Sequence, residues 1–200
     1  MIVRDQLSKV VWALERSSDP SSDFDLNPDV VLSSDRVLRA AGVLVPLIER
    51  QGDLFVILTK RSSALKHHPG QIAFPGGKQD DSDPDVTAAA LREASEEIGL
   101  NPTNVTVLGH MPIHETVTGF NVTPVIGRVL ADFSPLPEPG EVDEVFEVPL
   151  AHVCDPQNYL VQSRRWRGQR RHYFTVPYGP YYIWGATARI LRGLADRMEN

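Results

Sequence analysis

Residues 70–100 have the sequence GQIAFPGGKQDDSDPDVTAAALREASEEIGL, whose residue types predict a strand, a turn, an acidic loop and a helix. The apolar residues before Pro-Gly-Gly favour a short strand, and the glycines favour a turn. Asp83 is a good N-cap residue, Pro84 suits the first helical turn, and Gly99 suits a left-handed C-cap. The expected helix therefore covers residues 84–98.

Three glutamates of this helix, Glu93, Glu96 and Glu97, are spaced i, i+3 and i+4, so their side chains share one face. Like charges at this spacing repel each other by ~0.2–0.5 kcal/mol per pair, and the negative end of the helix dipole adds to the repulsion. One interpretation is a solvated acidic face, but such a face is normally interleaved with Lys or Arg, and here only Arg92 is near. The other is a site for a hard divalent cation, Mg²⁺ or Mn²⁺, which prefers carboxylate oxygens.

Gly77 and the run REASEEIGL at residues 92–100 resemble the Nudix box, G-x5-E-x7-R-E-U-x-E-E-x-G-U, where U is a bulky apolar residue. The second half matches at every charged and glycine position, with the small Ala94 where a larger residue is usual. In the first half, Gly77 lies fifteen positions before Arg92 instead of fourteen, and Asp83 replaces the early glutamate, which braces the loop in this family. This expansion resembles the coenzyme A (CoA) diphosphatase branch.

A second motif, upstream, is similar to the pattern L-L-T-x-R-S-x-x-L-x-x-H-x-G-x-x-x-F-P-G-G of CoA-type Nudix enzymes. Segments 116–127 and 181–191 are also similar to that branch, and the two motifs cover residues 58–100 almost without a gap. The matching stretches of the second motif are Leu58-Thr59-Lys60-Arg61-Ser62, Leu65, His68, Gly70-Gln71 and Phe74-Pro75-Gly76-Gly77.

The resemblance implies an α/β fold, the Nudix α/β/α sandwich around a mixed β-sheet. It also implies metal-dependent hydrolysis of the diphosphate bond of CoA or its thioesters, giving adenosine 3′,5′-bisphosphate and (acyl-)4′-phosphopantetheine. Glu93, Glu96 and Glu97 would hold Mg²⁺ or Mn²⁺, and Arg92 would orient these carboxylates. One alternative is a Nudix hydrolase of another nucleoside diphosphate derivative, such as ADP-ribose or a dinucleotide. Another is a non-catalytic Nudix-fold binding module, against which the complete glutamate set argues.

The resemblance further implies a set of residues that contact the substrate. Arg61 would recognise phosphate or the adenine nucleotide, although cations at a strand end are more often plain surface residues. His68 would bond either the loop or the substrate. A zinc site at the pair His67 and His68 is disfavoured, because no other His or Cys has ligand spacing. The backbone at the glycines would pass close to metal or phosphate, where a side chain would obstruct. The complete set is Lys60, Arg61, His68, Gln71, Gly76 and Gly77.

Further carboxylates are expected from segment 141–150, which resembles the E-V-x-E-V-F-x-V-P-L loop of the family. Nudix enzymes often draw a metal-binding or base carboxylate from this region, and the candidates are Glu141 and Glu144, with Glu144 placed among the catalytic residues. Glu115 could also project into the cleft, although a loop carboxylate in solvent is the more ordinary interpretation.

The most basic stretch is RRWRGQRRH at residues 164–172, and Gly168 and Gln169 within it predict a hairpin. Its arginines could neutralise the 3′-phosphate and diphosphate of a CoA-type ligand, because Arg binds phosphate bidentately. Equally, they could line an edge strand and prevent aggregation.

The composition, 42% hydrophobic and 23% charged over 200 residues, is that of a globular protein with one sizeable core. We expect residues 1–35 to form an N-terminal helix (5–16) and a linker that pack on the Nudix domain, residues 36–200. The hydrophobic pattern further predicts a packing face at Leu7, Val10, Val11 and Leu14, strands at 38–48, 54–58, 105–113 and 120–130, and a C-terminal helix at 183–197.

The net charge of −6 and the pI near 5.5 argue against general binding to nucleic acids or anionic membranes. The expected partner is a small CoA-like nucleoside diphosphate; the oligomeric state stays open. No apolar run is long enough to span a bilayer, the N-terminus does not resemble a signal peptide, and the single Cys154 fits a reducing compartment. A cytoplasmic location is therefore expected.

Overall fold

The computed structural model describes residues 3–33, 35–166 and 168–199. Its strands are β1 (Ser21–Ser22), β2 (Arg39–Arg50), β3 (Asp53–Arg61), β4 (Ile72–Ala73), β5 (Gly76–Lys78), β6 (Val105–His110), β7 (His114–Glu115), β8 (Phe120–Val129), β9 (Val142–Pro149), β10 (Leu160–Trp166) and β11 (Gln169–Thr175). Its helices are α1 (Val3–Glu15), α2 (Val86–Ile98), α3 (Leu150–Val153) and α4 (Gly185–Glu199), with 3₁₀ turns at Pro102–Asn104 and Pro156–Asn158.

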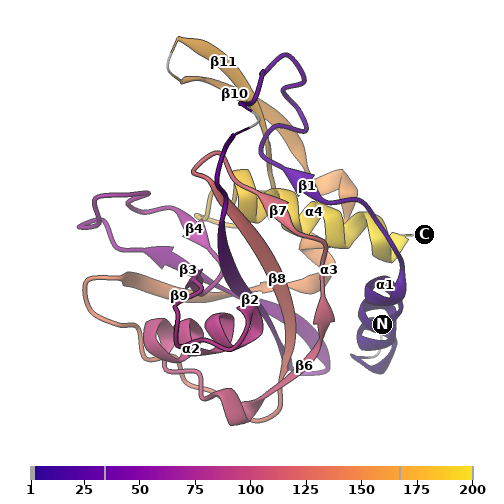
Figure 1. Ribbon diagram of the computed structural model, residues 1–200. Helices are drawn as coiled ribbons and strands as arrows, with labels where there is room; N and C mark the ends of the chain where they lie inside the picture. Colours follow the sequence, from indigo (N-terminus) through magenta and orange to yellow (C-terminus); the bar gives the residue numbers. More distant parts are fainter. Residues whose placement is uncertain (1–2, 34, 167, 200) are drawn as a thin grey trace.

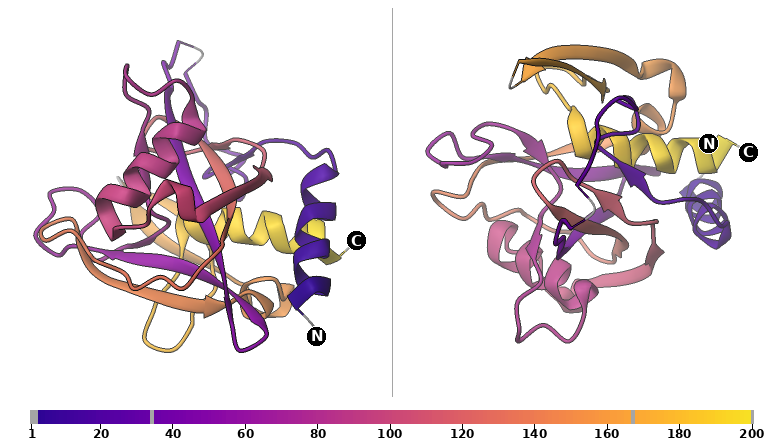
Figure 2. Two further views of the ribbon diagram at one scale, coloured as in Figure 1. Left: turned by 90° about the horizontal axis from the view of Figure 1, so that it is seen from below. Right: turned by 45° about the horizontal axis from the view of Figure 1, so that its top comes forward.

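The main sheet is mixed, with helices on both faces (Figures 1 and 2). Its path runs β1, β7, β8, β2, β3, β4; β5 also pairs with β2, β6 with β8, and β9 with β3. Strand β2 is parallel to β8 and antiparallel to β3. Strands β10 and β11 form a separate antiparallel hairpin, which stands above the sheet in Figure 1.

Two apolar cores cover the two faces of the sheet, because alternate residues of β2 point in opposite directions. Leu44 and Ile48 pack with Ala90 and Ala94 of α2. Val45 packs in the other core, together with α1 and α4. This arrangement confirms the predicted α/β/α sandwich around a mixed sheet.

Most predicted elements are present, with shifted boundaries. Predicted strands 38–48 and 54–58 are the antiparallel pair β2 and β3. The link between predicted strands 105–113 and 120–130 is more than a loop, since it contains β7. The C-terminal helix begins at Gly185 and not at residue 183, because the Ile183 carbonyl accepts a hydrogen bond from the Val176 amide at 2.9 Å.

The N-terminal segment packs on the rest of the chain through α1 and β1. Helix α1 contacts α4, β3 and β6, and the Gln6 side chain accepts a hydrogen bond from the Leu54 amide at 3.0 Å. Val11, predicted to face inward, is 37% exposed, and Ala13 is buried in its place. The expected linker is also partly wrong, because it contains β1, which pairs with β7. None of the helices in the described ranges is both long and apolar enough to cross a membrane.

The start of α2 differs from the prediction. Its N-cap is Asp85, whose Oδ1 accepts a hydrogen bond from the Ala88 amide at 2.8 Å, and the helix begins at Val86. The predicted N-cap, Asp83, binds the Arg92 guanidinium instead. Gly99 is the C-cap with φ 71°, as predicted.

Gly42 sets how closely α2 approaches the sheet. A Cβ at this position would overlap the Val86 carbonyl oxygen and lie 3.1 Å from the Ala90 nitrogen, both backbone atoms of α2. We expect Gly42→Ala to lower the free energy of unfolding by about 1–3 kcal/mol, since the whole helix must move. Urea denaturation measures this change.

The matched control is Gly193→Ala in α4, where a Cβ would make ordinary contacts at 3.5 Å and beyond. Alanine is a better helix former than glycine by up to ~1 kcal/mol, so this variant should be as stable as the wild type or more stable. A Gly42→Ala protein with wild-type stability would contradict the helix–sheet contact.

Candidate active site

Two glutamates of α2 lie against the glycine turn of β5. Glu97 is 4% exposed, and its Oε2 accepts a hydrogen bond from the Gly76 amide at 3.1 Å. A Cβ at Gly77 would overlap the Glu93 carboxylate, and a Cβ at Gly76 would lie 2.5 Å from the Gly42 carbonyl oxygen. The glycines therefore allow the strand to pass close to the carboxylates.

Burial, together with the neighbouring carboxylates, raises the pKa of both Glu93 and Glu97. Burial raises the pKa of Glu97 to about 7. The hydrogen bond from the Gly76 amide and the charge of Arg61 oppose this rise, and the charges of Glu93 and Glu141 add to it. Burial also raises the pKa of Glu93, with Arg92 opposing and Glu96 and Glu141 adding to the effect. The cluster therefore favours the binding of a proton or a cation.

Arg92 connects the helix to the acidic loop. Its Nη1 donates to Glu93 Oε1 at 3.0 Å and to Glu96 Oε2 at 3.1 Å. Its Nε and Nη2 bind both oxygens of Asp83 at 3.0 and 2.9 Å, and these hydrogen bonds lower the pKa of Asp83. Arg92 thus lies where it can orient the glutamates, and Asp83 braces the loop through Arg92.

Within the described ranges, no three Asp, Glu, His or Cys side chains are already gathered as a metal site. Arg92 contacts two of the three predicted ligands, and Glu96 has a side chain that is 59% exposed. The donor chemistry nevertheless fits a hard cation, because Glu93 and Glu97 are oxygen donors in a partly buried place, and the negative charge of the exposed Glu141 acts on both. A divalent cation would relieve this repulsion.

Lys60 and Arg61 lie on different sides of the site. Arg61 Nη1 is 3.8 Å from Glu97 Oε1, and the buried Arg61 Nε has no hydrogen-bond partner among the described residues. Lys60 lines a separate pocket with Glu144, which accepts a hydrogen bond from the Tyr181 hydroxyl. Successive residues of a strand point to opposite faces, which separates Lys60 from Arg61.

The carboxylate that joins the cluster from the segment after the proline-rich loop is Glu141, through its charge on Glu93 and Glu97. The structure does not bring the predicted catalytic Glu144 to this cluster, because Glu144 is held by Tyr181. Glu115 forms an ion pair with Arg36, outside the cleft.

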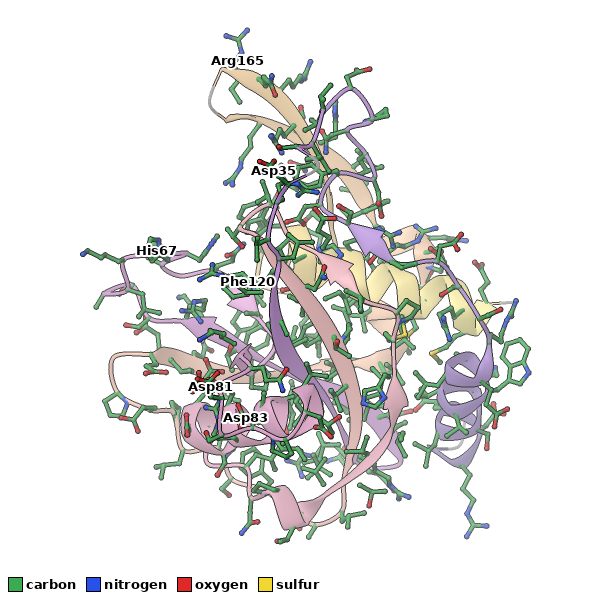
Figure 3. All side chains as sticks on the ribbon, in the orientation of Figure 1. Asp35, His67, Asp81, Asp83, Phe120 and Arg165 are labelled. Carbon is green, nitrogen blue, oxygen red and sulfur yellow. The ribbon has the colours of Figure 1, made fainter. Side chains whose placement is uncertain are left out.

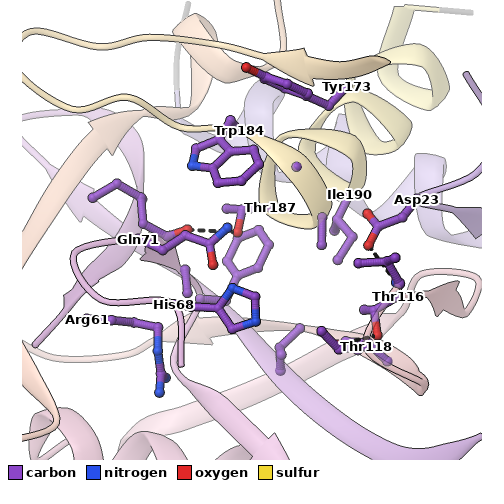
Figure 4. Close-up of a pocket in the computed structure, with 18 of the residues that line it drawn as sticks. Asp23, Arg61, His68, Gln71, Thr116, Thr118, Tyr173, Trp184, Thr187 and Ile190 are labelled. Atoms are coloured by element: carbon purple, nitrogen blue, oxygen red, sulfur yellow. Dashed lines mark hydrogen bonds between the residues drawn. The ribbon is translucent and has the colours of Figure 1, made fainter. Parts of the chain in front are cut away.

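A pocket of about 320 Å³ lies beside Gly76 and Arg61 (Figure 4). His68 and Gln71 point into it, as Figure 4 shows. Burial lowers the pKa of His68, helped by the charges of Arg61 and Arg164, so its imidazole is neutral near pH 7. The predicted residues Arg61, His68 and Gln71 thus share one wall.

The opposite walls contain residues that sequence reasoning missed as site residues. Trp184 directly precedes α4, Thr187 lies in the first turn of α4, Thr116 in the loop after β7, and Asp23 in the N-terminal segment. Segments 116–127 and 181–191 resemble the CoA-type branch, and this resemblance could have indicated Trp184, Thr187 and Thr116. Asp23 carries no local signal, because its partners His114 and Val117 are more than 90 positions away.

The predicted hairpin is present as β10 and β11, although Arg167 lies outside the described residues. Arg164 and Arg171 line the pocket. Arg165 stands at the far end of the hairpin and points away from the body of the protein (Figure 3).

Known proteins similar to this chain share the Nudix domain. The NUDIX domain family model matches residues 38–174. The chain is 43% identical over 157 residues to proteins named uncharacterized Nudix hydrolase NudL from Cronobacter sakazakii and from Escherichia coli SMS-3-5, covering 78% of this chain and 81% of each relative. A solved Ap4A hydrolase from C. elegans is 19% identical, with a TM-score of 0.49 over 57% of this chain and 82% of that one. On the family match and the identity to these relatives, the chain belongs to the Nudix hydrolase family.

Proposed function

We propose that this Nudix hydrolase cleaves the diphosphate bond of CoA or its thioesters, giving adenosine 3′,5′-bisphosphate and (acyl-)4′-phosphopantetheine. The observation that carries the proposal is the position of segment 58–77, whose sequence resembles the CoA-type motif. This segment supplies Arg61, His68 and Gln71 to the wall between the carboxylate cluster and the pocket. A nucleotide in the pocket therefore has its diphosphate beside the carboxylates.

The proposed ligands of Mg²⁺ or Mn²⁺ are Glu93, Glu97 and, from the exposed side, Glu96. A metal ion bound there would polarise a phosphoryl oxygen of the substrate and lower the pKa of the attacking water. Arg92 positions Glu93 and Glu96 through its hydrogen bonds. Glu141 is the proposed additional carboxylate, since its charge acts on the cluster.

Arg61 is proposed to bind the diphosphate. Its guanidinium faces the buried Glu97, and its buried Nε has a hydrogen bond to give. A substrate phosphate would satisfy this donor with a charge-assisted hydrogen bond. His68 and Gln71 would contact the part of the nucleotide that enters the pocket.

Turnover with Mg²⁺ or Mn²⁺ against a panel of diphosphates tests the proposed function. The panel contains CoA, acetyl-CoA, dephospho-CoA, ADP-ribose and a diadenosine polyphosphate. We expect kcat/KM for CoA to exceed that for ADP-ribose by at least about tenfold, a difference of ~1.4 kcal/mol. A preference for ADP-ribose or the dinucleotide would overturn the proposal.

Arg61→Ala tests the proposed diphosphate contact. The variant should lower kcat/KM for CoA by at least about tenfold, because a charge-assisted hydrogen bond contributes roughly 1.5–3 kcal/mol. Dephospho-CoA should be affected alike, since it has the same diphosphate. The control is Lys66→Ala, which removes an exposed cation from the same connecting segment and should leave both substrates unaffected. A loss confined to CoA would instead assign Arg61 to the 3′-phosphate.

A further inference from the structure

The hairpin places two pairs of arginines directly opposite each other. Arg164 is the register partner of Arg171, and Arg165 is the partner of Arg170. Like charges in directly opposed positions destabilise an antiparallel pair. An anion bound between two such arginines removes the repulsion.

The two pairs lie on opposite faces of the hairpin, because side chains alternate along each strand. Arg164 and Arg171 line the pocket, and Arg164 stacks on Trp184 with its guanidinium carbon 4.2 Å from the ring centroid. Stacking holds the guanidinium plane while its N–H edge stays available to a ligand. Arg165 points away from the protein at the hairpin end, and Arg170 Nε donates to Ser163.

The N-terminal segment holds the inward pair, Arg164 and Arg171, over the pocket. The Asn27 side chain donates to the His172 carbonyl at 2.9 Å and accepts from the His172 amide at 2.8 Å. The same segment is tied to α4 by Asp25, which pairs with Arg189 at 2.8 Å. These contacts fix β11, and with it Arg171, relative to the pocket wall.

Arg164 and Arg171 line the same pocket as Arg61 but come from a different element. Arg61 lies at the carboxylate cluster, 3.8 Å from Glu97, whereas Arg164 lies on the hairpin against Trp184. His68 lines the same pocket as Arg61 and Arg164, and the charges of both arginines lower its pKa, after the larger effect of burial. Phe74 and Ile190 add apolar surface to the same pocket.

We propose that Arg164 and Arg171 clamp a phosphate monoester on the ribose of the bound nucleotide, while its diphosphate lies at Arg61. The ligand class is therefore a nucleotide that carries a ribose phosphate in addition to its 5′-diphosphate. This inference rests on the proposed function, because it assigns the 3′-phosphate of CoA to the clamp.

Binding to the metal-free protein tests the clamp without turnover. Isothermal titration in EDTA compares adenosine 3′,5′-bisphosphate with adenosine 5′-monophosphate, which lacks the 3′-phosphate. The wild type should bind the bisphosphate at least about tenfold more tightly, since two charge-assisted contacts are added. Arg164→Ala combined with Arg171→Ala should abolish this preference and leave the monophosphate affinity unchanged.

The matched control combines Arg165→Ala with Arg170→Ala, which removes the same charge from the outward face of the same hairpin. It should keep the preference for the bisphosphate. If the inward double variant fails to fold, the single changes Arg164→Gln and Arg171→Gln replace it, each expected to weaken the preference. The clamp would be overturned if the wild type bound both ligands equally. It would also be overturned if the inward and outward variants lost the preference for the bisphosphate to the same extent.

Kinetics with CoA and dephospho-CoA separate the clamp from the proposed function. In the inward variant KM for CoA should rise by about tenfold at unchanged kcat, and KM for dephospho-CoA should rise much less, because that substrate lacks the 3′-phosphate. A loss of kcat with both substrates would contradict a role limited to binding the 3′-phosphate. If the wild type prefers the bisphosphate in titration but cleaves neither substrate, the clamp stands and the proposed reaction is wrong.

Discussion

Glu97→Gln is expected to lower kcat by roughly a thousandfold, the equivalent of about 4 kcal/mol of transition-state stabilisation, because we propose that this carboxylate holds the metal ion. The change replaces the carboxylate by an amide of the same shape, and the amide oxygen can still accept the hydrogen bond from the Gly76 amide. The fold should therefore persist. Turnover of CoA and a thermal melt of the same preparation measure the two effects.

Glu49→Gln is the matched control for this change. Glu49 lies on β2, away from the cluster, in a partly exposed ion pair with Arg128 at 3.7 Å. Such a pair contributes little to stability, so both turnover and melting should stay at wild-type values. A Glu97→Gln enzyme with near wild-type turnover and normal melting would rule out the proposed metal site.

The metal-free protein should lose stability as the pH rises from about 4.5 to about 7. The Glu97 carboxyl has a pKa of about 7 in the folded protein, above its ordinary value of 4.5. Below pH 4.5 both states are protonated and the group has no effect. As the pH rises, the unfolded state releases its proton first, so unfolding becomes easier by about 3 kcal/mol once the pH exceeds 7.

Denaturation in EDTA at several pH values measures this loss. The raised pKa of Glu93 acts in the same direction. The Gln side chain of the Glu97→Gln variant cannot ionise. In this variant the free energy of unfolding should therefore change much less with pH. A wild-type stability that stays constant from pH 4.5 to pH 8 would contradict the buried, unneutralised carboxylate.

Added Mg²⁺ should raise the melting temperature, and more at pH 8 than at pH 5.5. A cation that binds only the folded state stabilises it by mass action, and at pH 8 it also neutralises an ionised Glu97. The increase should be smaller in Glu97→Gln. An unchanged midpoint at saturating Mg²⁺ would show that the cluster does not hold the metal.

Local spacing in the sequence was sufficient for the elements around the site. The i, i+3, i+4 pattern placed Glu93, Glu96 and Glu97 on one helix, and Gly99 ends that helix as predicted. The hairpins were predictable because turn residues and alternating strands are short-range signals. The family motifs likewise identified the glycine turn and the wall of the pocket.

Competition between distant groups decided the details of the acidic loop and the extra carboxylate. Asp83 is not the N-cap because the Arg92 guanidinium, nine positions away, binds it, and Asp85 takes that role. Glu144 is held by Tyr181, so Glu141 is the carboxylate that acts on the cluster. Neither outcome depends on spacing within a single element.

The sequence by itself determined the helix, its glutamates, the basic hairpin and the membership of the Nudix family, because each depends on residue types at short, fixed spacings. Only the tertiary structure decided that Glu97 is buried, since its burial requires β5 to pack on α2. It also decided that Arg164 faces the pocket while Arg165 does not, and that Asn27 holds β11 from 145 positions away. Burial and the pairing of charges depend on segments that meet only after folding, and for this reason no local pattern contains them.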